Sequence, residues 1–322
     1  MRFTVPIVFL AFVGFVLPTH AQTDLALMTT PWRAASPIDG GGSLLFLPTK
    51  VDAAGGEDVD LSFVRYAARF RPDLKSDQKL TFAIDQTYLG IETGDPLLPE
   101  RLNKTAIAAG MVLGGFEALD KQWEWGASLG VGHASSNPFG DGQGWYGLGS
   151  VFAQTRLDET STLMLGVDFN GNRPIFPDLP LPAIIYTNRL NDQLTFALGL
   201  PINSVNWTPD DVWAVRLTVA GIAFSADVTM KLNDEFSLFA AYGGDGEGFH
   251  VADDDSNRRL FYSAEILEAG VRYGVTERAS LVIAGGFAFD QEFERGFDLR
   301  DTDTVRELDD TAYFRVGGRL EF

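Results

Sequence analysis

From about Leu61 to the C-terminus, apolar and polar residues alternate along the chain with a period of two. The clearest stretch runs from Trp123 to Gly132, where large apolar side chains alternate with glycine, serine and glutamate. A period of two places successive side chains on opposite faces of a strand, whereas an amphipathic helix needs a period near 3.6. We therefore expect an all-β protein whose strands are apolar on one face and polar or very small on the other.

The alternation predicts fourteen strands, most of them with the about 9 to 11 residues that a tilted membrane strand requires. They lie near residues 43–50, 60–71, 79–89, 105–116, 123–133, 145–154, 161–170, 193–206, 212–221, 223–232, 235–244, 259–274, 280–291 and 311–322. After Gln22 no apolar run is long enough for a membrane helix, so strands are the elements with which this chain would cross a membrane.

The predicted connections alternate in length. Mostly short ones (72–78, 117–122, 155–160, 207–211, 233–234, 275–279) take turns with mostly longer ones (90–104, 134–144, 171–192, 245–258, 292–310). Tight periplasmic turns opposite long external loops are typical of outer-membrane barrels. The short break at 221–223 violates the alternation, and deleting one hairpin leaves twelve strands. We expect a transmembrane antiparallel up-and-down β-barrel of 14 strands, alternatively 12, with both chain ends on the short-turn side.

The N-terminus predicts export. Arg2 precedes an apolar run from Val5 to Leu17 and a small-residue site ending at Ala21, which is the pattern of a secretory signal peptide over residues 1–21. The chain contains no cysteine, which excludes a lipid anchor at the cleavage site. We expect residues 22–42 to be an irregular segment and residues 43–322 to form the barrel, in the outer membrane of a Gram-negative cell.

Two features at strand ends favour the same location. Large aromatic residues gather at the predicted short-turn ends, as in the aromatic girdle of a membrane barrel: Trp123, Trp125, Trp207, Trp213, Phe236 and Tyr273. The last strand resembles the C-terminal signal of outer-membrane barrels through Gly317, Leu320 and Phe322. This resemblance implies that the barrel-assembly machinery is a partner.

Composition excludes several functions. Lys and Arg total 25 against 44 Asp and Glu, a net charge of −19, which opposes binding to nucleic-acid phosphates. The lack of cysteine removes disulfides, thiolate zinc sites and cysteine nucleophiles. We expect no cofactor, and partners limited to outer-membrane lipid, lipopolysaccharide, the assembly machinery and small solutes.

Assigning the apolar face to lipid sends the charged strand residues into the lumen, because a charge at the bilayer midplane is costly. The predicted lumen-lining residues are Arg65, Arg69, Asp85, Glu124, Asp168, Arg216, Asp227, Lys231, Glu268, Arg272, Arg315, Arg319 and Glu321. Small residues on the same face would leave room beside them: Gly126, Ser128, Gly130, Gly132, Gly147, Gly149 and Gly166. These features fit a narrow polar pore, and the mixed charges fit a salt-bridged plug equally well.

Catalytic and metal sites have weak signals. His133, followed by Ser135, Ser136 and Asn137, would be the basis of a barrel hydrolase, but the sequence supplies no base and nucleophile at known separation. His250 lies beside Asp253–Asp255 without the spacing of a calcium loop. The G-x-G-x-x-G at 142–147 leads into a strand rather than a helix. We predict no catalytic, cofactor-binding or metal residues and no enzyme activity.

The Pro-rich segment 171–182 is the most unusual local sequence, since it is apolar in a predicted external loop. Prolines can keep this segment rigid without the hydrogen bonds of a sheet. Three arrangements are open for it: folded inward as a constriction, laid across the mouth, or packed on its neighbours.

Three segments resemble an uncharacterised family of Gram-negative outer-membrane β-barrel proteins, a domain of unknown function. They are NRPIFPDLPLP (172–182), LTFALGLPINSVNWTP (194–209) and RLFYSAEILEAGVRYGV (259–275). A looser similarity in architecture is to outer-membrane transport proteins of aromatic-degradation operons. The family brings no substrate and no site residues.

The leading functional hypothesis is a narrow, porin-like passive channel for small solutes. The alternative is a closed structural or surface-interaction barrel without transport, and a barrel hydrolase ranks third.

Overall fold

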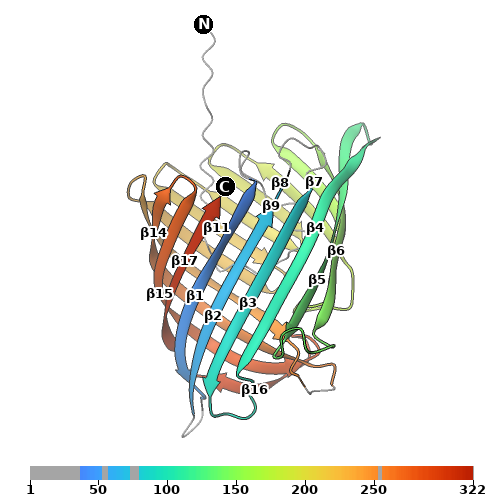
Figure 1. Ribbon diagram of the computed structural model, residues 1–322. Helices are drawn as coiled ribbons and strands as arrows, with labels where there is room; N and C mark the ends of the chain where they lie inside the picture. Colours follow the sequence, from blue (N-terminus) through green and yellow to red (C-terminus); the bar gives the residue numbers. More distant parts are fainter. Residues whose placement is uncertain (1–36, 53–56, 73–79, 253–255, 322) are drawn as a thin grey trace.

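The computed structural model describes residues 37–52, 57–72, 80–252 and 256–321, and its strands close into one barrel (Figure 1). The predicted signal peptide and all but the end of the predicted irregular segment lie outside these residues, as do Asp253–Asp255 and Phe322. The described residues hold no helix that is long and apolar enough to cross a membrane. The first strand begins at Ile38, five positions before the predicted boundary at residue 43.

The strands are β1 (Ile38–Lys50), β2 (Asp58–Phe70), β3 (Thr81–Thr93), β4 (Arg101–Ala118), β5 (Lys121–Ser135), β6 (Trp145–Arg156), β7 (Ser161–Asn170), β8 (Leu181–Arg189), β9 (Leu194–Leu200), β10 (Ile202–Trp207), β11 (Trp213–Ala220), β12 (Ala223–Lys231), β13 (Phe236–Phe249), β14 (Arg259–Thr276), β15 (Ala279–Gly296), β16 (Thr302–Leu308) and β17 (Thr311–Glu321). The strands of the wall pair antiparallel with their neighbours in the chain, except that β17 pairs with β15, and β1 closes the wall against β17. β16 and β17 pair with consecutive parts of β15, so they occupy one position and the wall has 16 strands.

The predicted counts of 14 and 12 strands are therefore wrong, and one of the two missing strands is β8. Residues 181–189 were expected to belong to a loop. Ala183 and Ile185 are apolar residues that face inward, so both faces of β8 are apolar and the period of two is lost. Pro182 also argues against a strand, although here it pairs with Val167 in the ladder.

The second missing strand comes from a turn without polar turn residues. Residues 193–206 were expected to be one strand, but the chain reverses at Leu200–Pro201, a cis peptide bond, to give β9 and β10. Asn203 holds the reversal: its Oδ1 accepts from the Gly199 amide at 3.0 Å, and its Nδ2 donates to the Gly199 carbonyl at 3.0 Å. The alternation of apolar residues continues through the tip, which hid the turn in the sequence.

The two rims differ as the connection lengths predicted, apart from one region. β1 starts and β17 ends at the same rim, since Asp39 pairs with Glu321, and we call this the terminal rim. At the opposite, far rim, the β9–β10 and β11–β12 connections are tight. In the second of these, Gly221 has φ 62°, in the left-handed region that glycine adopts readily.

The outer surface is apolar. Outward positions of neighbouring strands carry exposed aliphatic and aromatic side chains, among them Leu129 at 75 % and Ile283 at 57 % exposure. In the last strand Phe314, Val316 and Leu320 are exposed on this outer face, as the C-terminal alternation predicted. Five of the six predicted girdle residues are more than one third exposed, and the sixth, Trp123, stacks on Phe116 with ring centroids 6.1 Å apart.

The inner face is divided along the barrel axis. Toward the far rim, apolar side chains from β1 to β4 pack with side chains from β13 to β16 into a hydrophobic core inside the barrel, which includes Leu47, Leu61, Leu102, Phe249 and Phe293. Small residues line the wall of β4 and β5, although Gly147 and Gly149 do not belong to that lining. They pair with the outward Val131 and Leu129, so their predicted inward position is wrong.

Candidate functional site: the lumen and its covered mouth

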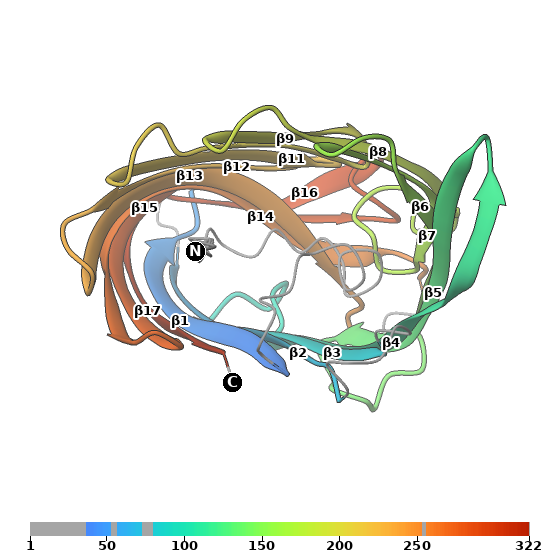
Figure 2. The ribbon, with the colours of Figure 1, turned by 90° about the horizontal axis from the view of Figure 1, so that it is seen from above.

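The β13–β14 hairpin crosses the far mouth of the barrel. β13 and β4 lie on opposite sides of the wall in strand order, yet the end of β13 contacts β4 and β5. His250 forms a parallel bridge with Ser135, because its amide donates to the Ala134 carbonyl at 3.0 Å and its carbonyl accepts from the Ser136 amide at 2.9 Å. Figure 2 shows β14 sweeping across the opening. Two strands of the barrel wall therefore cover the far mouth.

A buried ion cluster lies beneath the crossing. Lys104 on β4 places its Nζ 3.3 Å from Glu247 Oε1 on β13 and 3.8 Å from Asp85 Oδ2 on β3. Thr87 Oγ1 also donates to Glu247 Oε1, at 3.4 Å. Lys104, Thr87 and Glu247 are buried. Each contact to Glu247 joins opposite walls, so this cluster fastens the hairpin to β3 and β4 from within the lumen.

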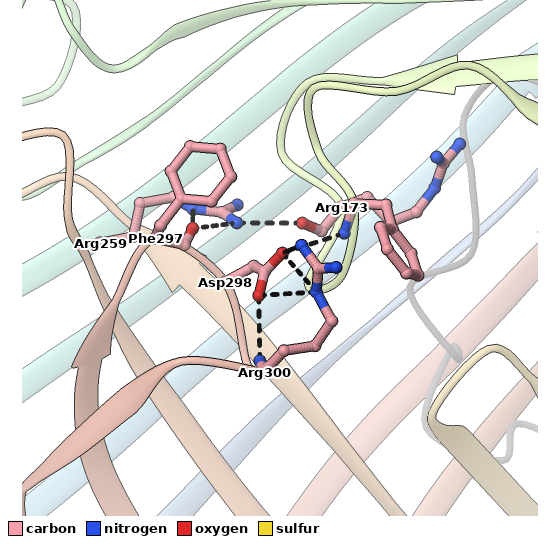
Figure 3. A network of polar contacts seen from close by, with 6 residues as sticks. Arg173, Arg259, Phe297, Asp298 and Arg300 are labelled. Atoms are coloured by element: carbon pink, nitrogen blue, oxygen red, sulfur yellow. Dashed lines mark hydrogen bonds and ion pairs between the residues drawn. The ribbon is translucent and has the colours of Figure 1, made fainter.

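Two loops of the far rim are tied to the hairpin by Arg259, the first residue of β14 (Figure 3). Its Nη1 donates to Asn172 Oδ1 at 3.0 Å, and its Nη2 donates to the carbonyls of Arg173 (3.0 Å) and Phe297 (2.9 Å). Arg259 is 3 % exposed. One buried guanidinium thus fixes the Pro-rich loop 171–180 and the loop 297–301 against the hairpin.

Asp298 reinforces the same junction (Figure 3). Its carboxylate accepts from the Arg300 guanidinium and from the Phe176 amide at 3.2 Å. The Arg300 guanidinium lies over the Phe176 ring, 3.8 Å from the centroid. The hydrogen bond from Arg300 outweighs burial and lowers the pKa of Asp298. Because the Leu299 amide also donates to the Pro174 carbonyl at 2.9 Å, the Pro-rich loop packs into the cover of the mouth.

A further tie joins the loop 94–100 to β16. Asp95 accepts a bidentate hydrogen bond from Arg306 and also caps the Leu97 amide at 2.9 Å. Burial alone would raise the pKa of Asp95, but these hydrogen bonds and the charge of Arg306 lower it. The carboxylate is therefore held in its charged form at the far rim.

The terminal half of the lumen is ionic. Glu268 accepts from Arg315 Nε at 2.9 Å and Nη2 at 2.5 Å, and from the Tyr313 hydroxyl at 3.0 Å. The side chains of Arg315 and Glu268 are each 1 % exposed. Nearer the terminal rim, Asp39 binds Arg69 at 3.0 Å and Arg319 at 2.8 Å. The Asp39 pairs join neighbouring strands where the wall closes, whereas Glu268 on β14 and Arg315 on β17 meet across β15.

The structure places the other predicted lumen residues as follows. Arg216 lies 3.9 Å from Asp227, Lys231 lies 2.7 Å from Asp234 in the β12–β13 turn, and Asp168 accepts from Arg173 of the Pro-rich loop. Glu124 is exposed near the terminal rim and accepts from Gln154 Nε2 at 3.2 Å. The side chain of Glu321 lies outside the described residues. Arg65 and Arg272 are both buried on the inner face.

His133 and Ser135 each contact Asp141. His133 Nε2 lies 2.9 Å from the Asp141 carbonyl oxygen, while Ser135 Oγ donates to the Asp141 carboxylate at 2.8 Å. In the part of the chain that the structure describes, no hydrogen bond joins His133 to Ser135, which a base and nucleophile would need. His133 packs against Trp145 and Phe139, with centroids 5.0 and 5.3 Å away. This group fixes the loop 136–144.

Sequence reasoning missed Lys104, Glu247 and Arg259. The predicted strands 105–116 and 235–244 leave out Lys104 and Glu247, so neither residue was assigned to the inner face. Arg259 was placed at a strand start and not in the cover. The unequal lengths of the strands around the wall would have been the signal, since an 18-residue strand such as β14 is too long for a simple membrane crossing. Within the described residues no group of three potential metal ligands is found.

Comparisons with known proteins leave the family open. No family model matches the chain, and no curated protein matches it. Among solved structures, the Pseudomonas putida toluene transporter TodX is 11 % identical, with TM-score 0.41 over 92 % of this chain and 93 % of that one. A Pseudomonas aeruginosa FadL homologue is 11 % identical, with TM-score 0.38 over 88 % and 89 %. The translocator domain of NalP from Neisseria meningitidis has 9 % identity and TM-score 0.31, over 92 % of this chain and 91 % of that domain. At these values the likenesses specify no function, and the resemblance to an uncharacterised family stays a prediction.

Proposed function

We propose that this protein lies in the outer membrane and is a narrow passive channel for small solutes, opened when the end of the β13–β14 hairpin moves away from the mouth. The observation that carries the proposal is the crossing itself. A wall of 16 strands is of the size that can enclose an aqueous channel, unlike an eight-stranded barrel filled by side chains. Here a piece of that wall covers the mouth, held by hydrogen bonds and the Lys104–Glu247 pair.

The apolar outer face supports the location. A wall whose outward positions are aliphatic and aromatic is stable in hydrocarbon, and a closed wall leaves no strand edge unpaired there. The exposed aromatic residues near the terminal rim fit the position of an interfacial girdle.

The chain's lack of cysteine allows a direct test. Ser135 and His250 are bridge partners, so cysteines at both positions fall within reach of a disulfide. We expect Ser135→Cys/His250→Cys to be silent in planar bilayers when oxidised, and to show discrete steps after reduction. The matched controls are the two single-cysteine variants, which should behave alike with and without oxidant. A wild-type protein that shows no conductance beside a conducting control porin contradicts the channel.

A closed structural or surface-interaction barrel is the second candidate. The hydrophobic core inside the far half and the fully paired Arg315–Glu268 cluster favour it, since both stabilise a filled lumen. This candidate predicts wild-type silence, and equal silence in the reduced and oxidised double-cysteine protein. Flux in the reduced form would exclude it.

A further inference from the structure

The barrel wall is low at the β9–β10 and β11–β12 hairpins. β9 has 7 residues, β10 has 6 and β11 has 8, whereas β4 and β14 have 18 each. Seven residues that rise 3.3 Å each along a strand tilted by 45° span only about 16 Å of bilayer depth. The apolar band of an outer-membrane barrel is about 25 Å tall. In Figure 1, β8, β9 and β11 lie toward the end of the barrel where β17 ends, whereas β16 lies at the opposite end. The wall on this side is therefore too short to cross a bilayer of ordinary thickness.

The terminal-rim ends of the two hairpins set their depth. Trp207 ends β10 and Trp213 begins β11, and both indole rings are exposed on the outer face. The turn between these strands carries Asp210 and Asp211. Indole rings favour the boundary between membrane and water, and carboxylates favour water. With this end of the wall at the boundary, the far tips of both hairpins lie inside the hydrocarbon and not beyond it.

The two far tips are apolar. Residues 199–202 are Gly-Leu-Pro-Ile and residues 220–223 are Ala-Gly-Ile-Ala, so neither turn contains a polar side chain. Leu200 is 60 % exposed and Ile222 is 44 % exposed. The terminal-rim turn between β10 and β11 differs, since Asp210 Oδ1 accepts from two amides of that turn at 2.8 Å. Turns that face water usually carry such residues. The far tips have instead the composition of a surface in contact with hydrocarbon.

The backbone of the tips finds hydrogen-bond partners within the protein. The Asn203 side chain binds both the amide and the carbonyl of Gly199. The Gly221 amide donates to the Pro201 carbonyl at 3.1 Å, which links the two tips. Pro201 has no amide hydrogen of its own to satisfy. Because hydrocarbon offers no hydrogen bonds, backbone groups can lie in it only when they are paired in this way.

The inner face beside the tips is apolar as well. Ala197 on β9 and Ile202 on β10 pack against a buried cluster that includes Phe152, Met164 and Ile185. An acyl chain that lies over the low wall from outside therefore meets apolar side chains on both of its faces.

We propose that acyl chains of the membrane lipid cover the tips of the β9–β10 and β11–β12 hairpins, so that the far leaflet of the bilayer dips over this side of the barrel. A wall shorter than the hydrocarbon is accommodated by local thinning of the bilayer, which is the physical cause of the dip. The proposal rests on the membrane location proposed above. It does not depend on conduction.

The absence of cysteine from the chain allows the tips to be probed one at a time. Leu200→Cys and Ile222→Cys are labelled with a thiol-reactive fluorophore, and the full chain is refolded into phosphatidylcholine vesicles. We expect both probes to be quenched by doxyl-labelled phosphatidylcholine. Quenching by aqueous iodide should be roughly tenfold weaker than at Gln143→Cys, because hydrocarbon excludes the ion. Gln143 is the matched far-rim control, since it is exposed in the loop 136–144.

Two results would overturn the proposal. Iodide quenching at both tips as strong as at Gln143→Cys would show that water covers them. Protection from both quenchers would show that protein covers them, as a second copy of the chain would. Leu129→Cys, on the outer face of β5, separates the two proposals. Lipid quenching at Leu129 without lipid quenching at the tips keeps the membrane location and removes only the lipid contact, whereas a Leu129 probe that iodide quenches removes both.

Discussion

The two halves of the lumen are filled by opposite means. Toward the far rim the interior is a hydrophobic core of leucines and aromatic residues, covered by the β13–β14 hairpin and the Pro-rich loop. Toward the terminal rim the interior holds ion pairs between strands that are adjacent in the wall or separated by one strand. The core excludes water by packing, which is non-directional. The ion pairs depend on geometry, so a single missing partner leaves a charge that the protein cannot satisfy.

The largest effect should come from breaking the terminal half at Glu268. Glu268→Gln leaves Arg315 buried without its carboxylate, and we expect the free energy of unfolding to fall by about 3 to 5 kcal/mol. Urea unfolding in lipid vesicles, followed by tryptophan fluorescence, measures the change. The control is Glu268→Gln/Arg315→Met, which removes both charges and should recover most of the loss. A single variant as stable as wild type would mean that water or ions solvate Arg315.

The far half should respond to lost volume instead of lost charge. Leu61 is 2 % exposed in the hydrophobic core, and Leu61→Ala should lower the free energy of unfolding by about 2 to 5 kcal/mol through lost burial and a cavity. The same unfolding assay measures it. Leu61→Met keeps the volume and should cost less than about 1.5 kcal/mol. Equal losses for alanine and methionine would contradict a tightly packed core.

A charged substitution on the outer face tests whether lipid or water surrounds the wall. Leu129 is 75 % exposed near the middle of β5, and Leu129→Arg should cost about 2 to 4 kcal/mol in vesicles if the bilayer covers it. The comparison variant is Leu119→Arg in the β4–β5 turn, where Leu119 is 86 % exposed and the change should be near zero. Two equal, negligible losses would argue against a membrane around β5.

The smallest effect is expected in a terminal-rim turn. The hydroxyl of Ser161 and the amide of Thr160 donate to Asp158 and lower its pKa to about 2. An aspartate in the unfolded chain has a pKa of about 3.9, so this stabilisation is complete above that pH and is lost as pH falls through about 2. Asp158→Asn should therefore be slightly less stable than wild type at pH 6, and the difference should vanish as the pH falls below about 2. A constant difference across this range would assign the effect to turn geometry alone.

Much of the wall follows from local pattern. The alternation at Trp123–Val131 predicted β5 to within two residues at each end, because one face of that strand is consistently apolar and the other consistently small. The same pattern did not predict β8, because Ala183 and Ile185 pack on Phe152 and Met164 inside the barrel and make its inner face apolar too. The β9–β10 turn was not predicted because the side chain of Asn203, four residues after Gly199, replaces the usual turn residues.

Alternation is a property of each strand alone, so the amino-acid pattern is enough to predict an all-β chain with an apolar outer face and charged residues inside. How the lumen is filled depends instead on contacts between strands that are far apart in the chain. Lys104 and Glu247 are 143 residues apart and meet because the wall curves through half a circle before β13 folds across it. Closure of the wall also brings Arg315 to Glu268 and Arg319 to Asp39, since partners in a barrel are set by register and curvature rather than by distance along the chain.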